Sequence, residues 1–83
     1  MQVTVYSTPT CPFCKQAKIF LRERNVAFTD VDVSVDHDQA QEMIKKSGQM
    51  GVPVIVVVKD NEQEEIIIGF ERAKLAQAVG VKE

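Results

Sequence analysis

The feature that most constrains this chain is a pair of cysteines placed where one kind of sequence pattern gives way to another. Cys11 and Cys14 are separated by two residues. The residues before them, 3–6, are β-branched and aromatic, as in a strand, whereas residues 12–24 place apolar side chains at helical spacing. The pair therefore lies at a strand-to-helix turn, the setting in which a Cys-x-x-Cys motif indicates chemistry rather than chance.

The start of this helix gives the two cysteines different properties. If the helix begins at Pro12, a residue type suited to the first helical position, Cys11 lies at the N-cap. The N–H groups of a first helical turn lack intrahelical partners, and the helix dipole adds partial positive charge there. The Cys11 sulfur can then accept a hydrogen bond from the N–H of Phe13 or Cys14, which favours the nucleophilic thiolate. Cys14, one turn into the helix, is more shielded and suits the role of resolving a mixed disulfide on Cys11.

Three other interpretations of the cysteine pair are open. A structural disulfide is one, although closing so short a loop removes little entropy from the unfolded chain. A metal- or iron–sulfur-binding module is the alternative function, but two thiolates fill only half of a tetrahedral zinc site. No second cysteine pair follows, and the one histidine, His37, is distant in sequence. Two buried, unreactive cysteines fit poorly with a proline between them at a helix start. We expect no bound cofactor or resident metal.

The composition is that of one small domain without strong charge. We predict a single domain over residues 1–83, and its apolar content of 45% is enough for one core. Folding at this length removes only about 60–65% of the unfolded chain's surface, so we expect modest stability. The net charge of −2 provides no basic patch for nucleic acid. We expect a monomer.

The sequence also suggests where the protein works. It has no apolar run near the ~20 residues that cross a bilayer, so we expect no membrane partner. Its first residues lack the charged-then-apolar form of a signal peptide. Two cysteines without a secretion signal indicate a reducing compartment, where Cys-x-x-Cys performs redox or metal chemistry. We therefore expect a cytoplasmic protein.

The rest of the chain divides into alternating strands and helices. The expected strands are residues 3–6, 27–33, 54–58 and 65–68. The expected helices are residues 12–24, a segment between a cap at Asp36 and a stop at Gly48, and residues 71–79. This β-α-β-α-β-β-α order predicts an α/β fold with a four-stranded mixed sheet flanked by three helices. The first two strands should be parallel with a right-handed crossover, and the last two should form an antiparallel hairpin.

The apolar spacing also predicts which helix faces are buried. In the first helix the expected inward residues are Ala17, Ile19, Phe20 and Leu21. The residues expected outside that face are Lys15, Lys18, Arg22 and Glu23. The continuous apolar run at 54–58 is typical of a strand covered on both faces.

A second informative feature is Pro53, at the start of the strongest strand. Proline cannot donate to a sheet ladder, so it occurs at strand starts, edges and bulges. X-Pro is also the one common setting for a cis peptide bond. A cis bond after Val52 beside Cys11 would leave the Val52 N–H and C=O free to pair with an extended substrate segment, as an added strand. The alternative is that Pro53 merely begins a buried strand in the trans form.

These features together resemble the glutaredoxin branch of the thioredoxin superfamily. The Cys-Pro-Phe-Cys motif at 11–14, the Val-Pro pair at 52–53 and the order of elements are in register with that family over essentially the whole chain, as are Tyr6 and Thr10. The resemblance implies a thioredoxin-like fold and a cis bond before Pro53. It also implies a dithiol thiol–disulfide oxidoreductase, an electron carrier with Cys11 as nucleophile and Cys14 as resolving thiol.

Two departures from the family pattern concern the electron donor. Glutathione-using glutaredoxins usually have lysine where this chain has Thr8, and a Gly-Gly followed by an acidic pair where it has Gly69 and Phe70. The Gly69-Phe70 pair of this chain, followed by a charged helix start, is more similar to the glutaredoxin-like redoxins that serve ribonucleotide reductase and are recharged by thioredoxin reductase. The resemblance thus implies disulfide-containing protein substrates, with ribonucleotide reductase as one candidate, and either glutathione or thioredoxin reductase as reductant.

The residues expected to bind substrate are Thr8, Pro12, Phe13, Val52, Pro53, Gly69 and Phe70. Phe13 is expected to be exposed and to pack on the partner, because it shares a turn with a reactive thiol. The alternative is a ring tucked into the core. Tyr6 is expected in the core of its strand.

Overall fold

The computed structural model describes residues 1–82 and contains the expected elements in the expected order. The strands are β1 (Gln2–Ser7), β2 (Thr29–Asp32), β3 (Val54–Val58) and β4 (Glu64–Ile68). The helices are α1 (Pro12–Glu23), α2 (His37–Ser47) and α3 (Arg72–Val79). The sheet order is β2-β1-β3-β4. β1 and β2 are parallel, and β3 is antiparallel to both β1 and β4. The predicted thioredoxin-like α/β architecture is therefore confirmed.

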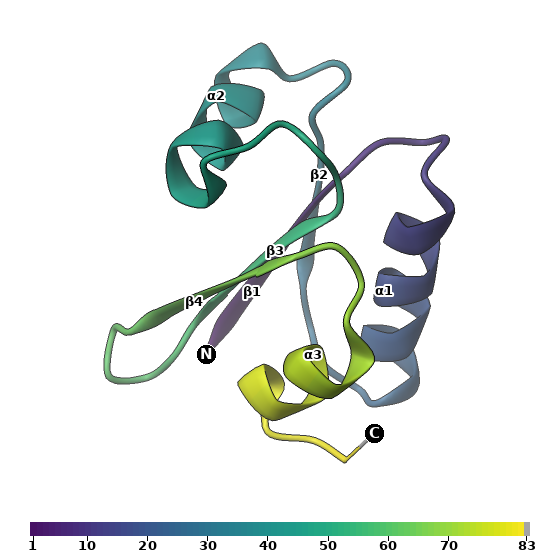
Figure 1. Ribbon diagram of the computed structural model, residues 1–83. Helices are drawn as coiled ribbons and strands as arrows, with labels where there is room; N and C mark the ends of the chain where they lie inside the picture. The colour runs from purple at the N-terminus through teal and green to yellow at the C-terminus, as the bar shows by residue number, and fades with distance from the viewer. Residues whose placement is uncertain (83) are drawn as a thin grey trace.

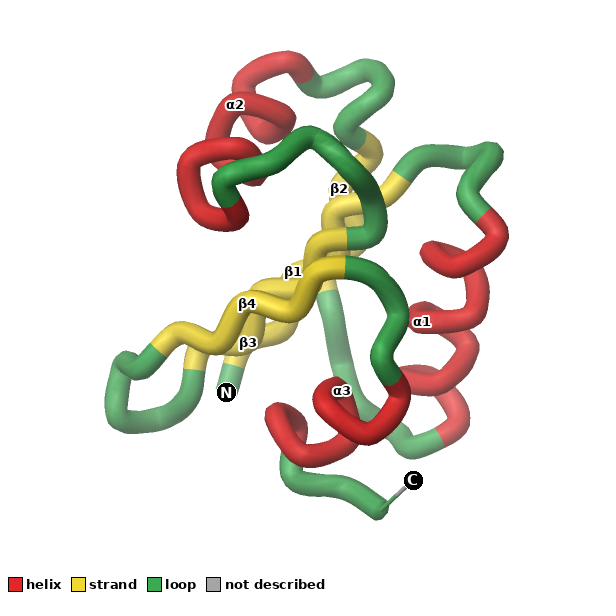
Figure 2. Tube along the Cα trace, in the orientation of Figure 1, coloured by secondary structure: helices red, strands yellow, loops and turns green. Residues whose placement is uncertain are grey.

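The sheet is the middle of three layers (Figure 1). α1 and α3 cover one face, and α2 covers the other. Figure 2 shows the four strands crossing between these helices. In the described residues, no helix has the length and apolar character needed to cross a bilayer.

Each face of the sheet has its own apolar cluster, because successive strand residues point to opposite faces. Val5 and Ile55 pack with α1 and α3, whereas Tyr6 and Val54 pack with Met43 of α2. This arrangement explains why the sequence of β3 is apolar without interruption. The expectation that Tyr6 belongs to the core is confirmed, since its side chain is buried.

The predicted helix boundaries have clear local causes. The Asp36 carboxylate accepts a hydrogen bond from the Gln39 N–H at 3.1 Å, which caps the start of α2. Gly48 ends the same helix in the left-handed conformation, with φ of 74°. Asn25, just after α1, also has a positive φ of 58°, as a helix stop requires.

Two side chains of α1 lie differently from the prediction. Ile19 was expected to face inward but is 49% exposed. The helix face that meets the sheet is formed by Ala17, Phe20 and Leu21 instead. Lys18 was expected to lie outside, yet its side chain is only 16% exposed. The Lys18 ammonium lies 3.0 Å from the exposed carboxylate of Asp30, on the neighbouring edge strand β2, so the lysine side chain lies along the protein surface.

The second strand is shorter than the predicted segment 27–33. Only four residues of β2 are in register with β1, from Thr29 opposite Thr4 to Asp32 opposite Ser7. The Val33 N–H still donates to the Ser7 carbonyl at 3.0 Å, but the Asp32 carbonyl then accepts from the turn that leads to α2. Because pairing stops where this turn begins, the strand ends one residue early.

Candidate active site

The two cysteines form a disulfide at the start of α1. Their Cα atoms are 5.2 Å apart, within the usual range of roughly 4.4–6.8 Å. Cys11 is the N-cap residue, with extended backbone angles, and Pro12 is the first residue of the helix. The Cys14 N–H donates to the Cys11 sulfur at 3.1 Å. The predicted position of Cys11 at the tip of the helix is therefore confirmed.

The two sulfur-bearing residues differ in their access to solvent. Cys14 is 0% exposed, because it lies on the face of α1 that packs on the core. Cys11 is half-buried, and Phe13 between them is 59% exposed. The expected exposure of Phe13 is thus confirmed, and its ring is not tucked into the core.

A second loop approaches the disulfide from the start of β3. The peptide bond between Val52 and Pro53 is cis, as the family resemblance implied. The Val52 carbonyl oxygen lies 3.9 Å from the Cys11 sulfur, and Pro53 is buried. The Pro53 carbonyl accepts a hydrogen bond from the Gly69 N–H at 2.8 Å, which ties a third loop to this one. The connections β1–α1, α2–β3 and β4–α3 all lie at the same end of the sheet (Figure 1).

The other residues predicted to bind substrate differ in where they lie relative to the active-site loop. The Thr8 carbonyl accepts from the Cys11 N–H at 3.4 Å, so Thr8 shapes the active-site loop. Gly69 has a positive φ of 80°, which suits glycine at this turn. The Phe70 ring packs edge-to-face on Phe20, with centroids 6.0 Å apart, on the side of α1 and α3. Its role in binding substrate stays a prediction.

The sequence analysis missed a polar network behind the active-site loop. Ser7, the last residue of β1, is buried and donates to the Asp30 carboxylate at 2.7 Å, and Lys18 reaches the same carboxylate. Burial raises the pKa of Asp30. The hydrogen bonds from Ser7 and Lys18, with the charges of Lys18 and Arg22, outweigh burial and hold this pKa below its usual 3.8. A serine ending an apolar strand was the available sequence signal, because a buried hydroxyl needs a partner.

This network gives a prediction on pH-dependent stability. Asp30→Asn is expected to lower the free energy of unfolding at pH 7 by about 0.2–1 kcal/mol, because the Asp30 carboxylate is 43% exposed and solvent screens the pair. A lowered folded-state pKa contributes stability above the unfolded pKa, about 3.9, and this contribution is lost as pH falls through the folded-state value. The difference from wild type in urea unfolding should therefore shrink below about pH 4.

The matched control for Asp30→Asn is Glu62→Gln, which removes one exposed negative charge from the turn between β3 and β4. Within residues 1–82, Glu62 makes no ion pair. It should change stability little at any pH. A deficit of Asp30→Asn that is independent of pH would contradict the role of the ionised carboxylate.

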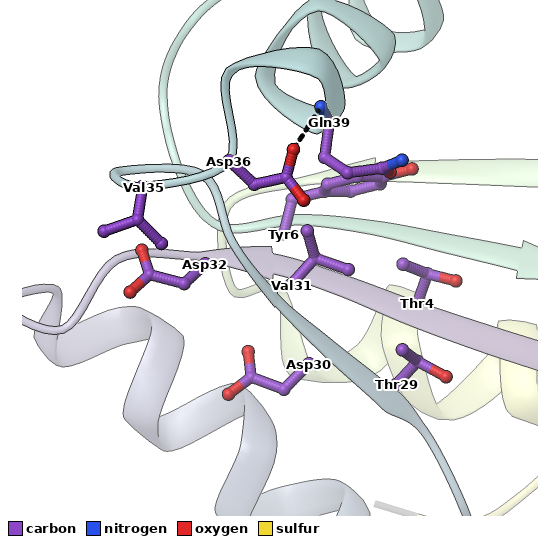
Figure 3. Close-up of a pocket in the computed structure, with 9 residues that line it drawn as sticks. All are labelled: Thr4, Tyr6, Thr29, Asp30, Val31, Asp32, Val35, Asp36 and Gln39. Carbon is purple, nitrogen blue, oxygen red and sulfur yellow. Dashed lines mark hydrogen bonds between the residues drawn. The ribbon is translucent and has the colours of Figure 1, made fainter.

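An open groove of about 550 Å³ lies between β2 and the start of α2. Figure 3 shows Tyr6 and Gln39 together at one side of it, with Asp30 pointing away from them. The groove is lined by Thr4, Tyr6, Thr29, Asp30, Val31, Asp32, Val35, Asp36 and Gln39. Since none of the predicted substrate-binding residues lines it, the groove is separate from the disulfide site. In the described part of the chain, no group of three His, Cys, Asp or Glu residues is placed to hold a metal ion.

The sequence is similar to known redox proteins. The model of the glutaredoxin family matches residues 3–62. The glutaredoxin-like 8.6 kDa protein in the rubredoxin operon of Clostridium pasteurianum is 42% identical over 77 residues, 93% of this chain and 96% of that protein. Glutaredoxin 3 of Escherichia coli K12 is 36% identical over 55 residues, 66% of each chain. N-acetyl-S-hydroxy-L-cysteine reductase of Bacillus subtilis is 30% identical over 79 residues, 94% of this chain and 85% of that enzyme.

Solved structures agree with the sequence comparison. A variant of the thioredoxin-like protein BC3987 superposes with a TM-score of 0.82 and 30% identity, over 98% of this chain and 97% of that one. The glutaredoxin of Archaeoglobus fulgidus, 24% identical, has the same fold with a TM-score of 0.81 over 94% of this chain and 85% of its own. Because the family match covers most of the residues and the Clostridium relative aligns almost end to end, the chain belongs to the glutaredoxin family and is a glutaredoxin-like disulfide oxidoreductase with a redox-active Cys-x-x-Cys pair.

Proposed function

We propose that this protein is a dithiol electron carrier in which Cys11 is the nucleophile and Cys14 the resolving thiol. The observation that carries the proposal is the difference between the two sulfurs. Cys11 caps α1, is partly accessible and accepts the Cys14 N–H at 3.1 Å, whereas Cys14 is fully buried. After reduction, the same N–H and the positive end of the helix favour the thiolate on Cys11.

The reaction transfers two electrons in two exchanges. The Cys11 thiolate attacks one sulfur of a substrate disulfide, forms a mixed disulfide, and the other substrate sulfur leaves as a thiolate that takes up a proton. Cys14 then loses its proton and attacks the Cys11 sulfur, which breaks the mixed disulfide, releases the second substrate thiol and forms the Cys11–Cys14 disulfide. The substrate is reduced and the protein dithiol is oxidised by the same two electrons.

Several neighbouring residues suit a protein substrate. The Val52 carbonyl beside Cys11 can pair with the backbone of an extended segment that carries the reacting sulfur. The exposed ring of Phe13 offers apolar contact to the same segment. We assign the binding of substrate to this surface, which is completed by Thr8, Pro12 and Gly69, while the buried Pro53 acts by holding the backbone next to Val52. The substrates are disulfide-containing proteins, with ribonucleotide reductase as the candidate that the family resemblance suggests.

Thioredoxin reductase is the proposed reductant rather than glutathione. Thr8 stands where glutathione-using glutaredoxins carry a lysine, and it offers no positive charge to a carboxylate of glutathione. Phe70, in place of the second glycine of the family's Gly-Gly pair, packs on Phe20. Both departures remove groups that would hold glutathione, while leaving the dithiol exchange intact.

A paired assay of NADPH oxidation tests the choice of reductant. One reaction contains thioredoxin reductase and the other contains glutathione with glutathione reductase, each with insulin as the disulfide probe. We expect turnover with thioredoxin reductase and only background oxidation with glutathione. Turnover with glutathione alone would contradict the interpretation of Thr8 and Phe70.

The ionisation of Cys11 provides a separate prediction. In the Cys14→Ser variant, ultraviolet absorbance of the thiolate should rise with a midpoint well below about 8.5, the value of a free cysteine. The physical cause is the helix N-terminus, where a negative charge is stabilised. A midpoint near that of free cysteine would count against Cys11 as an activated nucleophile.

The Bacillus subtilis relative supports a second candidate substrate, the sulfenic acid of a small thiol. The name of that enzyme specifies reduction of N-acetyl-S-hydroxy-L-cysteine, and the similarity spans 94% of this chain. Cys11 would attack the sulfenic sulfur, the hydroxide would leave and become water, and Cys14 would resolve the resulting mixed disulfide. Prereduced protein mixed with N-acetylcysteine sulfenate generated in situ should then form the Cys11–Cys14 disulfide faster than with a protein disulfide; a slower reaction would exclude this substrate as the preferred one.

A further inference from the structure

The loop between α2 and β3 contains a side chain that binds both backbone groups of a neighbouring residue. The Gln49 Oε1 accepts a hydrogen bond from the Gly51 N–H at 2.6 Å, and its Nε2 donates to the Gly51 carbonyl at 3.0 Å. One carboxamide thus satisfies the two groups that an adjacent strand would otherwise bind. Gly51 is thereby held in place two residues before Pro53.

The Gln49 side chain is itself held by the end of α2. Its Nε2 also donates to the Ser47 hydroxyl oxygen at 3.3 Å, and the Ser47 hydroxyl donates to the Met43 carbonyl at 2.7 Å in the last turn of the helix. Both Gln49 and Ser47 are half-buried. The carboxamide is therefore fixed to a rigid element rather than free to rotate in solvent.

The carbonyl of Val52 lies on the side of the disulfide. Its oxygen lies 3.9 Å from the Cys11 sulfur, and within residues 1–82 the Val52 N–H donates to no protein acceptor. Val52 itself lies in a bend between Gly51 and Pro53. Gln49 therefore holds the residue before Val52, while the Val52 carbonyl lies beside the Cys11 sulfur and its N–H is left without a protein partner among the described residues.

We propose that Gln49 is a positioning residue that gives this site its preference for reacting sulfurs carried on an extended peptide. Gln49 does not touch the substrate; it acts through Gly51, whose backbone would otherwise sample many conformations. Holding Gly51 in advance removes the ordering cost that a peptide would meet when it pairs with Val52. This inference rests on the proposed reaction at Cys11 and concerns selectivity within it.

Two matched probes separate peptide pairing from the chemistry. Both are mixed disulfides of thionitrobenzoate, one with the cysteine of a short unstructured peptide and one with 2-mercaptoethanol, which has no backbone to pair. Prereduced protein is mixed with each, and release of coloured thionitrobenzoate gives two rate constants. In Gln49→Ala we expect the peptide-to-mercaptoethanol ratio to fall about 5- to 10-fold, the scale of losing a well-held hydrogen-bonded pair, with the mercaptoethanol rate unchanged.

Gly51 provides a second route to the same effect. A Cβ added at Gly51 would lie 2.7 Å from the Gln49 Oε1, so Gly51→Ala must displace the carboxamide. Gly51→Ala alone should lower the ratio as Gln49→Ala does, and the double variant should lower it no further, since both remove one interaction. Gln41→Ala, at an exposed position on α2, is the matched control and should leave the ratio unchanged.

The outcomes distinguish this inference from the reaction on which it rests. If wild-type protein reacts with neither probe, the reaction at Cys11 and this inference both fail. If wild-type protein reacts with both and the ratio in Gln49→Ala stays within about twofold of wild type, the assigned role of Gln49 is wrong while the reaction stands. Equal losses of rate with both probes would also show that the role assigned to Gln49 is wrong. A purely structural defect slows the reaction whether or not the probe has a peptide backbone.

Discussion

Cys11→Ser is expected to reduce disulfide turnover to the uncatalysed background. A serine hydroxyl at this N-cap stays protonated near neutral pH and does not form a disulfide, so neither exchange step can begin. The helix should persist, because serine is itself a favoured N-cap residue that can accept the Cys14 N–H. The measurement is insulin reduction under the same reductase conditions as wild type, with circular dichroism to confirm the fold.

Cys14→Ser separates the two steps of the cycle. Cys11 should still attack a disulfide, but the mixed disulfide should accumulate because the resolving thiol is gone. Mass spectrometry of the variant after exposure to an excess of peptide disulfide should show one peptide bound per chain, released by dithiothreitol. The opposite pattern, in which Cys11→Ser traps the peptide on Cys14 and Cys14→Ser traps none, would reverse the assigned roles.

Leu21→Ala is expected to cost about 2–5 kcal/mol of the free energy of unfolding. Leu21 is 0% exposed and belongs to the cluster between α1, α3 and the sheet. A domain of 83 residues has a total stability of roughly 4–12 kcal/mol, so this single cavity removes a large fraction of it. The melting temperature of the oxidised protein, measured by calorimetry, should fall by about 10–30 °C. Urea unfolding of the same protein measures the loss of free energy directly.

Ile19→Ala is the matched control on the same helix. It removes a side chain of the same volume, but one that is half-exposed, so the loss should stay within about 0.5 kcal/mol. If Ile19→Ala were as damaging as Leu21→Ala, the orientation of α1 on the sheet would be wrong.

The architecture was predictable because the strongest local patterns all agree with it. The apolar run of β3, the caps at Asp36 and Gly48 and the proline at the start of α1 each specify a boundary without knowledge of the rest of the chain. The position of Cys11 follows from the same logic, since a helix that begins at Pro12 leaves one place for the preceding residue. Local chemistry therefore predicted both the element order and the helix-tip sulfur.

The parts that sequence reasoning missed depend on contacts between distant or unpatterned residues. Lys18 is largely covered because it pairs with Asp30 on another strand, and helical periodicity counts any lysine as fully exposed. The hydrogen bonds of Gln49 arise from the particular path of the loop after α2, for which glutamine has no characteristic spacing. Ile19 shows the same limit, because an apolar residue next to a buried face need not be covered.

The borders of the sheet bear on how this protein behaves at high concentration. An exposed strand edge is a template on which other chains can polymerise into aggregates. Here one border is the four-residue strand β2 with aspartates at positions 30 and 32, and the other, β4, begins with Glu64 and Glu65 bound to lysines. Short strand edges that carry charged residues oppose edge-to-edge pairing between copies at high concentration. This protection matters because each copy also exposes the ring of Phe13 near its disulfide.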